Sequence, residues 1–297
     1  MAKTSMSFES GFDEIVRLHE PMAPHTWMGI GGPAAFFVEP RSVEELQSVV
    51  QRAAAEGLPI RLLGGGSNLL VREVGLPGVV LRLSAPAFNQ IQTSKNVATA
   101  GGGARLGHVI STAVRAGLGG LEALVGIPGT IGGALHGNAG GNGGDIGQWT
   151  CSADVMTRSG EIISRGREDL VFAYRHSSLD ELVILSAQFT LEEEDAQELT
   201  KRMQKQWIVK KAGQPLAHQS AGCIFKNPRG ISAGMLIDQA GMKGTRVGGA
   251  EVSDRHANFI VVDRDATSND VLQLIDLVRS RVAEQLGVEL ELEIEIW

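Results

Sequence analysis

The chain has 297 residues, 43% of them hydrophobic and 21% charged, with a net charge of −7 and a sequence pI of about 5.6. This composition is that of an ordinary globular protein with room for two domains, or for one large domain with a lobe. The acidic balance argues against nucleic acid or an anionic membrane as a partner, although a few local Lys and Arg side chains could still bind a small anion.

The sequence shows neither a targeting segment nor a membrane span. Its first residues, MAKTSMSFESGFDE, contain no apolar stretch of the signal-peptide kind. No run of about 18 apolar residues occurs, so we expect no membrane insertion and a cytoplasmic location. Cys151 and Cys223 are far apart and belong to no CxxC or Cys/His spacing, so neither a disulfide framework nor a metal site is expected.

Glycine is the one anomalous residue type. The chain has 38 glycines among 297 residues, about 13%, against a usual ~7%. Glycine accepts positive φ and lets a backbone approach a ligand closely, so clusters that follow apolar runs predict loops wrapped around a ligand. The clusters lie at 29–32, 64–66, 101–103, 117–120, 126–147 and 241–249.

The N-terminal two thirds of the chain mixes helices and strands. Ser42 and Glu45 form a capping-box pair in front of apolar residues at helical spacing, which predicts a helix that ends at Gly57 and Pro59. A second helix is predicted in LGHVISTAVRAGLGG, closed by Gly117. Strands are predicted at 60–63, 78–83, 97–104 and 182–192.

The composition changes after a charged helical segment, so we place a domain boundary near 200–210. Beyond it, SAGCIFKNP and HANFIVV read as strands, and SAGMLIDQAG reads as a short helix with Ser232 as its N-cap. A long amphipathic helix follows, capped by Thr267 or Ser268. The strict alternation of VELELEIEIW predicts a closing strand over 288–297.

The common nucleotide fingerprints are absent. GGGSNL has leucine where a Rossmann motif needs its third glycine, GGGARLG also fails the spacing, and no P-loop sequence occurs. The loops LLGGGSNLL and GIPGTIGGALHGNAGGNGG could still hold a pyrophosphate through backbone N–H groups, with tight turns as the alternative. GISAG matches the nucleophile-elbow pattern but follows no buried strand, and Ser232 is better explained as a helix cap.

Several side chains have two open interpretations. Arg175, in FAYRHSS, could hold a carboxylate or could be a surface arginine. His256 is more typical of a hydrogen-bonded structural histidine than of a catalyst. Four glutamates share one face of the closing strand, which is either solvated or turns one of them into a cleft. They are Glu289, Glu291, Glu293 and Glu295.

Taken together, the motifs resemble one family, the UDP-N-acetylenolpyruvoylglucosamine reductases, also called UDP-N-acetylmuramate dehydrogenases. The resemblance runs from about HTWMGIGGPAAFF, at 25–37, to the C-terminus. It rests on LLGGGSNLLV, GLEALVGIPGTIGGALHGNAGGNGGDI, FAYRHS, KKAGQPLAHQSAGCIFKNP, AGMLIDQAGMKGTRVGGAEVSDRHANFIV and the terminal glutamate-rich strand, all in the family's order.

The resemblance implies an α+β fold: an FAD-binding domain of the vanillyl-alcohol-oxidase (PCMH) type and a smaller C-terminal α+β substrate domain. We accordingly divide the chain into a variable segment 1–20, an FAD-binding domain 21–204 with lobes of about 21–85 and 86–204, and a substrate-binding domain 205–297. The resemblance also implies that FAD is bound non-covalently by residues of the glycine loops. These are Gly64, Gly65, Gly66, Ser67, Asn68, Leu69, Gly126, Ile127, Pro128, Gly129, Thr130, Gly132, Gly133, Asn138 and Gly140.

The implied reaction belongs to the synthesis of the bacterial cell-wall precursor. NADPH is the hydride source, and UDP-N-acetylglucosamine enolpyruvate is reduced to UDP-N-acetylmuramate. By residue-by-residue match, Arg175 and Glu293 polarise the enolpyruvyl carboxylate and Cys223 stands at the proton-donor position. Lys211 and Asn227 match residues that contact the substrate, and Lys211 would help to neutralise the UDP diphosphate.

Two features depart from the usual family pattern. One subtype of the family has an extra tyrosine-bearing loop. The connection between Arg175 and the strand at 182 is too short for this loop, so the protein resembles the shorter subtype. Cys223 replaces the usual serine after SAG. We expect a monomer. The competing hypotheses are another flavoenzyme of the same fold with a different substrate and a non-catalytic nucleotide-sugar binding protein.

Overall fold

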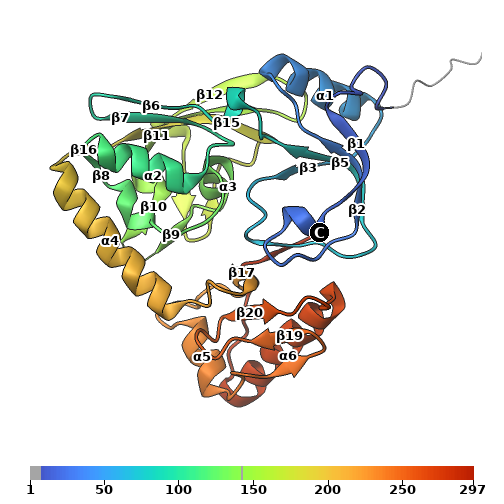
Figure 1. Cartoon of the computed structure of the whole chain (residues 1–297), viewed down its shortest axis with the longest axis vertical. Coiled ribbons are helices and arrows are strands. Elements are labelled where there is room, and N and C mark those ends of the chain that lie inside the picture. The colour runs from blue at the N-terminus through green and yellow to red at the C-terminus, as the bar shows by residue number, and fades with distance from the viewer. Residues whose placement is uncertain (1–7, 142) are drawn as a thin grey trace, which may run out of the picture. The chain divides into compact units, whose positions relative to one another are not determined.

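The computed structural model describes residues 8–141 and 143–297, and the chain forms two compact units (Figure 1). The first unit comprises the chain up to Glu20, then Ala34–Gly65 and Leu76–Trp207; the second comprises Pro21–Pro33, Gly66–Gly75 and Ile208–Trp297. Two short N-terminal segments therefore group with the C-terminal part of the chain. The boundaries proposed from the sequence stay a prediction.

The first sheet of unit 1 is built around parallel strands. Its order is β1 (Val16–Pro21), β2 (Pro33–Val38), β5 (Leu76–Arg82) and β3 (Ile60–Leu63), and β5 pairs in parallel with both β2 and β3. Helix α1 (Val43–Ala55) connects β2 to β3 and buries Leu46, Val49, Val50 and Ala53 in the same hydrophobic cluster as β5. The helix and the strands at 60–63 and 78–83 confirm the sequence predictions, whereas β1 and β2 were not predicted.

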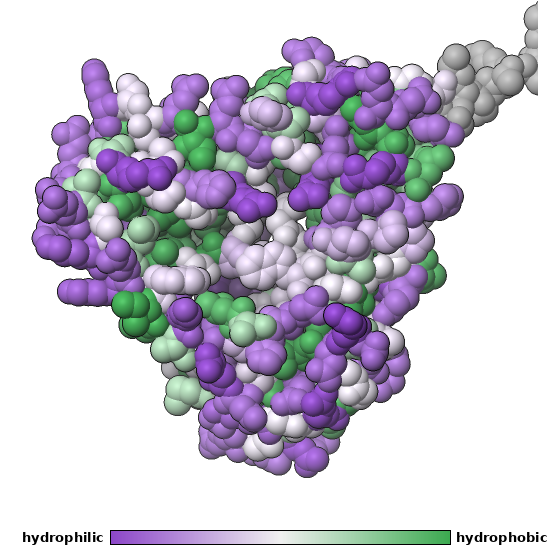
Figure 2. All heavy atoms as spheres, viewed as in Figure 1, coloured by the Kyte–Doolittle hydropathy of each residue, from purple (hydrophilic) through white to green (hydrophobic). Residues whose placement is uncertain are grey.

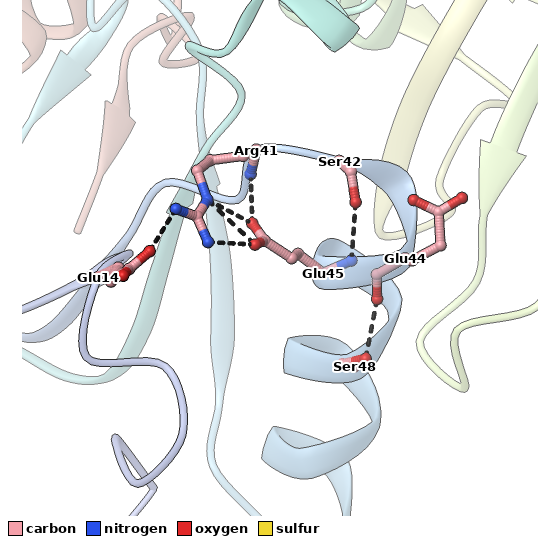
Figure 3. A network of polar contacts seen from close by, with 6 residues as sticks. All are labelled: Glu14, Arg41, Ser42, Glu44, Glu45 and Ser48. Carbon is pink, nitrogen blue, oxygen red and sulfur yellow. Dashed lines mark hydrogen bonds and ion pairs between the residues drawn. The ribbon is translucent and has the colours of Figure 1, made fainter.

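The predicted cap of α1 is present in a modified form (Figure 3). The hydroxyl of Ser42 accepts the Glu45 N–H at 3.3 Å, as a capping box requires. The Glu45 carboxylate, however, accepts the N–H of Arg41 at 2.8 Å instead of that of Ser42. The Arg41 guanidinium also bonds Glu45 and reaches Glu14 at 2.5 Å, and its hydrogen bond lowers the pKa of Glu45.

The second sheet of unit 1 has five antiparallel strands. Their order is β12 (Ile162–Gly166), β11 (Thr150–Met156), β15 (Val183–Thr190), β7 (Val97–Gly101) and β6 (Ile91–Ser94). Helices α2 (Leu106–Arg115) and α3 (Ile131–His136) share its main hydrophobic cluster. The predicted strands at 97–104 and 182–192 and the second predicted helix are confirmed with shorter bounds.

Short elements complete unit 1. Three two-strand pairs are β8 (Leu118–Gly119) with β16 (Glu192–Glu193), β9 (Gly140–Gly141) with β10 (Gly144–Asp145), and β13 (Phe172–Ala173) with β14 (His176–Ser177). Single 3₁₀ turns lie at Pro86–Phe88, Leu121–Leu124, Ile146–Gln148 and Arg167–Asp169. The chain leaves unit 1 within helix α4 (Ala196–Gly213), the predicted charged helix.

Unit 2 is a four-stranded antiparallel sheet with two helices. The strand order is β17 (Gln219–Cys223), β20 (Phe259–Val262), β19 (Ala250–Val252) and β18 (Arg246–Val247). Helix α6 (Ser268–Leu286) lies against β18 and β19, and α5 (Ala233–Gln239) lies against α6 (Figure 1). Ser232 caps α5 as predicted, and Thr267 caps α6 in a capping box with Asp270. A 3₁₀ turn at Ala23–His25 also belongs to this unit.

The predicted closing strand over 288–297 is wrong in extent. Only β21 (Glu295–Ile296) is a strand, paired in parallel with β4 (Leu69–Leu70), and Leu292 adds a single bridge to Phe225. The alternation of burial is nonetheless present, because Leu290 and Ile294 are buried. The segment changes partners along its length, which interrupts the ladder.

Figure 2 shows the polarity of one face of the described residues. On the face drawn in Figure 2, hydrophilic side chains predominate and hydrophobic ones lie in small groups between them. None of the helices in the described ranges combines the length and the apolar character that crossing a bilayer requires.

Candidate functional site

Two of the predicted cofactor loops touch one another in unit 1. A Cβ added to Gly65 would lie 2.7 Å from the Cα of Gly129, and one added to Gly64 would lie 3.0 Å from the Thr130 hydroxyl. A real side chain does not tolerate the first of these approaches, so the backbones meet only because residue 65 is glycine. The structure therefore brings the loops at 64–65 and 126–133 together.

The donors of these loops suit an anion. Among the described residues, the backbone N–H groups of Gly65, Gly66 and Ser67 have no hydrogen-bond partner. The first turn of α3 differs, because the N–H groups of Ile131 and Gly132 bond the carbonyls of Ala104 and Gly102. Unpaired N–H groups in a glycine turn form a concave anion site. Loop 64–67 thus fits the pyrophosphate of FAD, and it would hold that group through its backbone.

The predicted carboxylate-binding arginine lies at the tip of a tight hairpin. Tyr174 and Arg175 connect β13 to β14, and Arg175 has φ +55°, a conformation uncommon for a residue other than glycine. Its guanidinium donates to the Gly140 carbonyl at 3.1 Å and lies 5.2 Å from the Tyr174 ring centroid. Arg175 therefore lies beside Gly140, one of the predicted cofactor residues.

Asn138 fixes this hairpin to α3. Its buried amide donates to the Ala173 carbonyl at 2.9 Å and accepts the Gly147 N–H at 3.1 Å. The Ser177 hydroxyl adds a bond to the His136 carbonyl at 3.0 Å. The segment that carries Arg175 is thus held by the residues that directly follow the glycine loop. A cofactor contact of Asn138 itself stays a prediction.

Cys223 and Glu293 come together in unit 2. Cys223 ends β17 just after Gly222, which has φ +74° and lies in a register shift against β20. The Glu293 N–H donates to the carbonyl of Ile224, the next residue after Cys223, at 2.8 Å. On its other side, the Glu293 carbonyl accepts the Asn68 amide at 2.9 Å. The backbone of Glu293 is therefore fixed from two directions.

The structure also separates the four terminal glutamates. Glu293 is half-buried, whereas the other three are exposed. Glu291 forms only a 3.7 Å ion pair with Lys226, with its side chain 80% exposed. The solvated-face interpretation therefore holds for Glu289, Glu291 and Glu295. Glu293 is the glutamate that is not turned fully to solvent, which is consistent with its predicted role.

The predicted substrate residues lie elsewhere in the second part of the chain. Lys211 is exposed at the end of α4, beside half-buried Lys210, whose pKa is lowered by burial. The Asn227 amide oxygen accepts the Ala233 N–H at 2.9 Å, at the start of α5. Substrate contacts of Lys211 and Asn227 stay predictions.

His256 makes a hydrogen bond of the kind expected for a structural histidine. Its Nδ1 accepts the Asn258 N–H at 3.3 Å, and burial lowers its pKa. Asn258 itself was not among the predicted functional residues, because HANF reads only as the start of a strand. The structure shows a buried side-chain amide there with two hydrogen bonds to the backbone of Phe225, while the backbone N–H of Asn258 donates to His256.

Among the described residues, neither Cys151 nor Cys223 forms a disulfide. Cys151 lies on β11, and its thiol donates to the Gln188 carbonyl at 3.4 Å. Within the ranges 8–141 and 143–297, no group of three or more His, Cys, Asp or Glu side chains is arranged to hold a metal ion.

Comparison with known proteins identifies the family. Residues 34–166 match the model of an FAD binding domain, and residues 214–297 match that of the UDP-N-acetylenolpyruvoylglucosamine reductase C-terminal domain. The UDP-N-acetylenolpyruvoylglucosamine reductase of Rhodopirellula baltica is 39% identical over 283 residues, covering 95% of this chain and 93% of the relative. That of Moorella thermoacetica is 41% identical over 290 residues, covering 97% and 95%. The chain belongs to the UDP-N-acetylenolpyruvoylglucosamine reductase family.

A solved member of this reductase family has the same fold. The crystal structure of the reductase from Thermus caldophilus is 39% identical and aligns with a TM-score of 0.81, covering 95% of this chain and 99% of that one. The predicted fold class, an α+β FAD-binding domain followed by a smaller C-terminal α+β domain, is confirmed.

The glycine contact between the two loops gives a first prediction for this reductase. We expect Gly65→Ala to lower both the FAD content of the purified protein and its melting temperature, because the new Cβ would force the Gly129 backbone away. The 450 nm absorbance per protein and a thermal melt measure the two effects.

A matched control for Gly65→Ala lies in α2. Gly107 is helical and has no atom within 4 Å of an added Cβ, so Gly107→Ala should keep the FAD and stabilise the helix by roughly 1 kcal/mol. Equal FAD content in Gly65→Ala and Gly107→Ala would show that loop 64–67 is not part of the cofactor site.

Proposed function

We propose that this chain is an NADPH-dependent flavoenzyme that reduces UDP-N-acetylglucosamine enolpyruvate to UDP-N-acetylmuramate in the synthesis of bacterial peptidoglycan precursors. The observation that carries the proposal is the identity of about 40% with the curated reductases over nearly the whole of both chains. The glycine loop at 64–67, with its unpaired N–H groups, supports the cofactor.

The residues Arg175 and Glu293 have the role of holding the enolpyruvyl carboxylate. When bound, FAD supplies hydride transfer from NADPH to the methylene carbon of the enol. Negative charge then develops toward the carboxylate, and a fixed guanidinium stabilises that charge at little reorganisation cost. Glu293 must carry a proton, or share one, to lie beside a carboxylate. The pairing of Arg175 with Glu293 rests on the family motifs in which they stand.

Cys223 has the role of the proton donor. After hydride addition, the carbon that bears the sugar ether needs a proton from a positioned acid. A thiol, with a reference pKa of about 8.5, is a far stronger acid than a serine hydroxyl. The half-buried position of Cys223, one residue from the carbonyl that binds Glu293, supports the assignment. Water would return the proton to the thiolate.

The remaining assignments complete the proposal. Lys211 and Asn227 contact the UDP part of the substrate, and Lys211 offsets the charge of its diphosphate. The assignment of the chain to the shorter subtype is supported by the short connection between β14, which ends at Ser177, and β15, which begins at Val183. The enzyme is a cytoplasmic monomer.

A visible spectrum followed by two anaerobic additions tests this function. We expect the purified protein to be yellow, NADPH to bleach it, and the enolpyruvyl substrate to restore the colour. Stoichiometric UDP-N-acetylmuramate should form in the second step.

Other outcomes identify the competing functions. Bleaching followed by fast reoxidation with O2, without any response to the enolpyruvyl substrate, would indicate an oxidase of the same fold. A colourless protein that stays colourless after addition of FAD would exclude both flavoenzyme hypotheses and leave a nucleotide-sugar binding protein.

A further inference from the structure

Asn258 makes an unusual set of contacts with the strand that carries Cys223. Asn258 is buried, with 3% of its surface exposed, and directly precedes β20. Its amide donates to the Phe225 carbonyl at 2.8 Å and accepts the Phe225 N–H at 3.0 Å. Its backbone carbonyl accepts the Ile224 N–H at 2.8 Å. One asparagine thus engages three backbone groups of two successive residues.

The local backbone explains why an amide is needed there. The pairing of β17 with β20 shifts register between Ser220 and Cys223, where Gly222 has φ +74°. Such a bulge disrupts the ladder and bends the strand. Beyond Cys223 the chain leaves β20, and the side chain of Asn258 takes the place of the missing strand residue by bonding both the donor and the acceptor of Phe225.

The opposite edge of this segment holds the other proposed catalytic residue. The Ile224 carbonyl accepts the N–H of Glu293 at 2.8 Å and that of Ile294 at 3.3 Å. Phe225 also forms a bridge to Leu292. Ile224 and Phe225, which follow Cys223 in the sequence, are therefore hydrogen-bonded to Asn258 on one side and to the segment of Glu293 on the other. A shift of these two residues would move Cys223 and Glu293 relative to one another.

We propose that Asn258 is a positioning residue that sets the geometry between Cys223 and Glu293 by fixing the Ile224–Phe225 backbone. The inference rests on the proposed function of those two residues. Asn258 needs no contact with substrate or cofactor for this role, since its side-chain bonds all go to Phe225. Its effect should therefore fall on the half-reaction that uses Cys223 and Glu293, and the reduction by NADPH should be unchanged.

Two variants remove the bonds in different ways. Asn258→Leu keeps the approximate volume and removes both side-chain bonds to Phe225. Asn258→Asp keeps the shape and an acceptor for the Phe225 N–H, but its carboxylate cannot donate to the Phe225 carbonyl. We expect both to slow anaerobic reoxidation by the enolpyruvyl substrate about 10- to 100-fold, because small misplacements at a reacting centre have effects of that size. The rate of NADPH reduction should stay at the wild-type value.

Ser253 provides the matched control. It is also buried, in the turn before Asn258, and its hydroxyl accepts the N–H groups of Arg255 and His256, whereas neither of these bonds involves Phe225. Ser253→Ala should lower the melting temperature, as the Asn258 variants do, while both half-reactions stay normal. A purely structural role of Asn258 would give the same pattern in its variants, and that result would overturn the proposal.

The reactivity of the Cys223 thiol gives a second readout that needs neither substrate nor FAD. In a Cys151→Ser background, iodoacetamide should alkylate Cys223 faster in Asn258→Asp and Asn258→Leu than in the parent or in Ser253→Ala. Unchanged alkylation in both Asn258 variants would also overturn the proposal. If the parent is never reoxidised by the enolpyruvyl substrate, the proposed function fails, and the alkylation rates still decide whether Asn258 fixes the segment around Cys223.

Discussion

Cys223→Ala is expected to slow reoxidation by the enolpyruvyl substrate by about 10²- to 10⁴-fold, the range over which a positioned general acid contributes. The reason is that alanine has no proton to give to the carbon that bears the sugar ether. Reduction by NADPH does not need that proton, so bleaching should proceed at the wild-type rate. Anaerobic stopped-flow absorbance at 450 nm measures both steps in one preparation.

Two further cysteine variants make this result specific. Cys223→Ser should keep much of the activity, since a hydroxyl at the same position still carries a proton that it can donate. Cys151→Ala removes the other thiol, which lies on β11 in unit 1 and bonds the Gln188 carbonyl, and it should leave both half-reactions unchanged. Normal turnover of Cys223→Ala would show that the proton comes from another group.

Helices α1, α5 and α6 could be predicted because their signals are local, whereas α3, which lies in the glycine-rich stretch read as a loop, was not predicted. Ser42, Ser232 and Thr267 cap α1, α5 and α6, and each accepts an N–H from within the first turn of its own helix. The information needed for such a boundary lies within a few residues. Strands β1 and β2 were missed for the opposite reason. Their pairing is not local, since β2 pairs with β5 across 42 positions (76 − 34), and short mixed stretches such as VRLHEP show little period-2 pattern.

The C-terminal segment shows what alternation can and cannot predict. The pattern of VELELEIEIW correctly indicated that Leu290 and Ile294 are buried, whereas Leu292 and Ile296 are only partly buried. It could not show that this segment changes its hydrogen-bonding partner. Residues 291–293 form backbone hydrogen bonds with 224–226, whereas the N–H groups of Glu295 and Trp297 donate to carbonyls within 68–70. The tertiary structure decides which strand pairs with this segment, because the backbone N–H and C=O groups are nearly the same in every residue and carry no information about the partner.

The candidate site residues could be predicted from the sequence where the type of a side chain limits the chemistry that it can perform. The glycine loops, Arg175, Cys223 and Glu293 were named from motifs, and their roles still rest on those motifs. The supporting contacts were not predictable. Asn68 was expected only in the cofactor loop, yet its amide also bonds the Glu293 carbonyl. Asn258 lies 35 positions from Cys223 in the sequence (258 − 223), and only the fold brings the two strands together.

Glu293→Ala should also slow the substrate half-reaction, by about 10²- to 10³-fold, the usual effect of removing one group that stabilises developing negative charge. The backbone of residue 293 should stay in place, because its hydrogen bonds to Ile224 and Asn68 do not involve the side chain. The loss would therefore report on the carboxyl group itself. NADPH reduction should again be unchanged, and stopped-flow reoxidation at several substrate concentrations separates the rate from the affinity.

The protonation state of Glu293 can be tested with a neutral isostere. If Glu293 donates a hydrogen bond to the substrate carboxylate, Glu293→Gln retains a donor of the same shape and should be faster than Glu293→Ala. Glu291→Ala is the matched control, since Glu291 lies two residues away with its side chain 80% exposed. It should match the wild type. A Gln variant no faster than the Ala variant would contradict the proton-bearing form, and a Glu293→Ala variant at the wild-type rate would remove Glu293 from the catalytic set altogether.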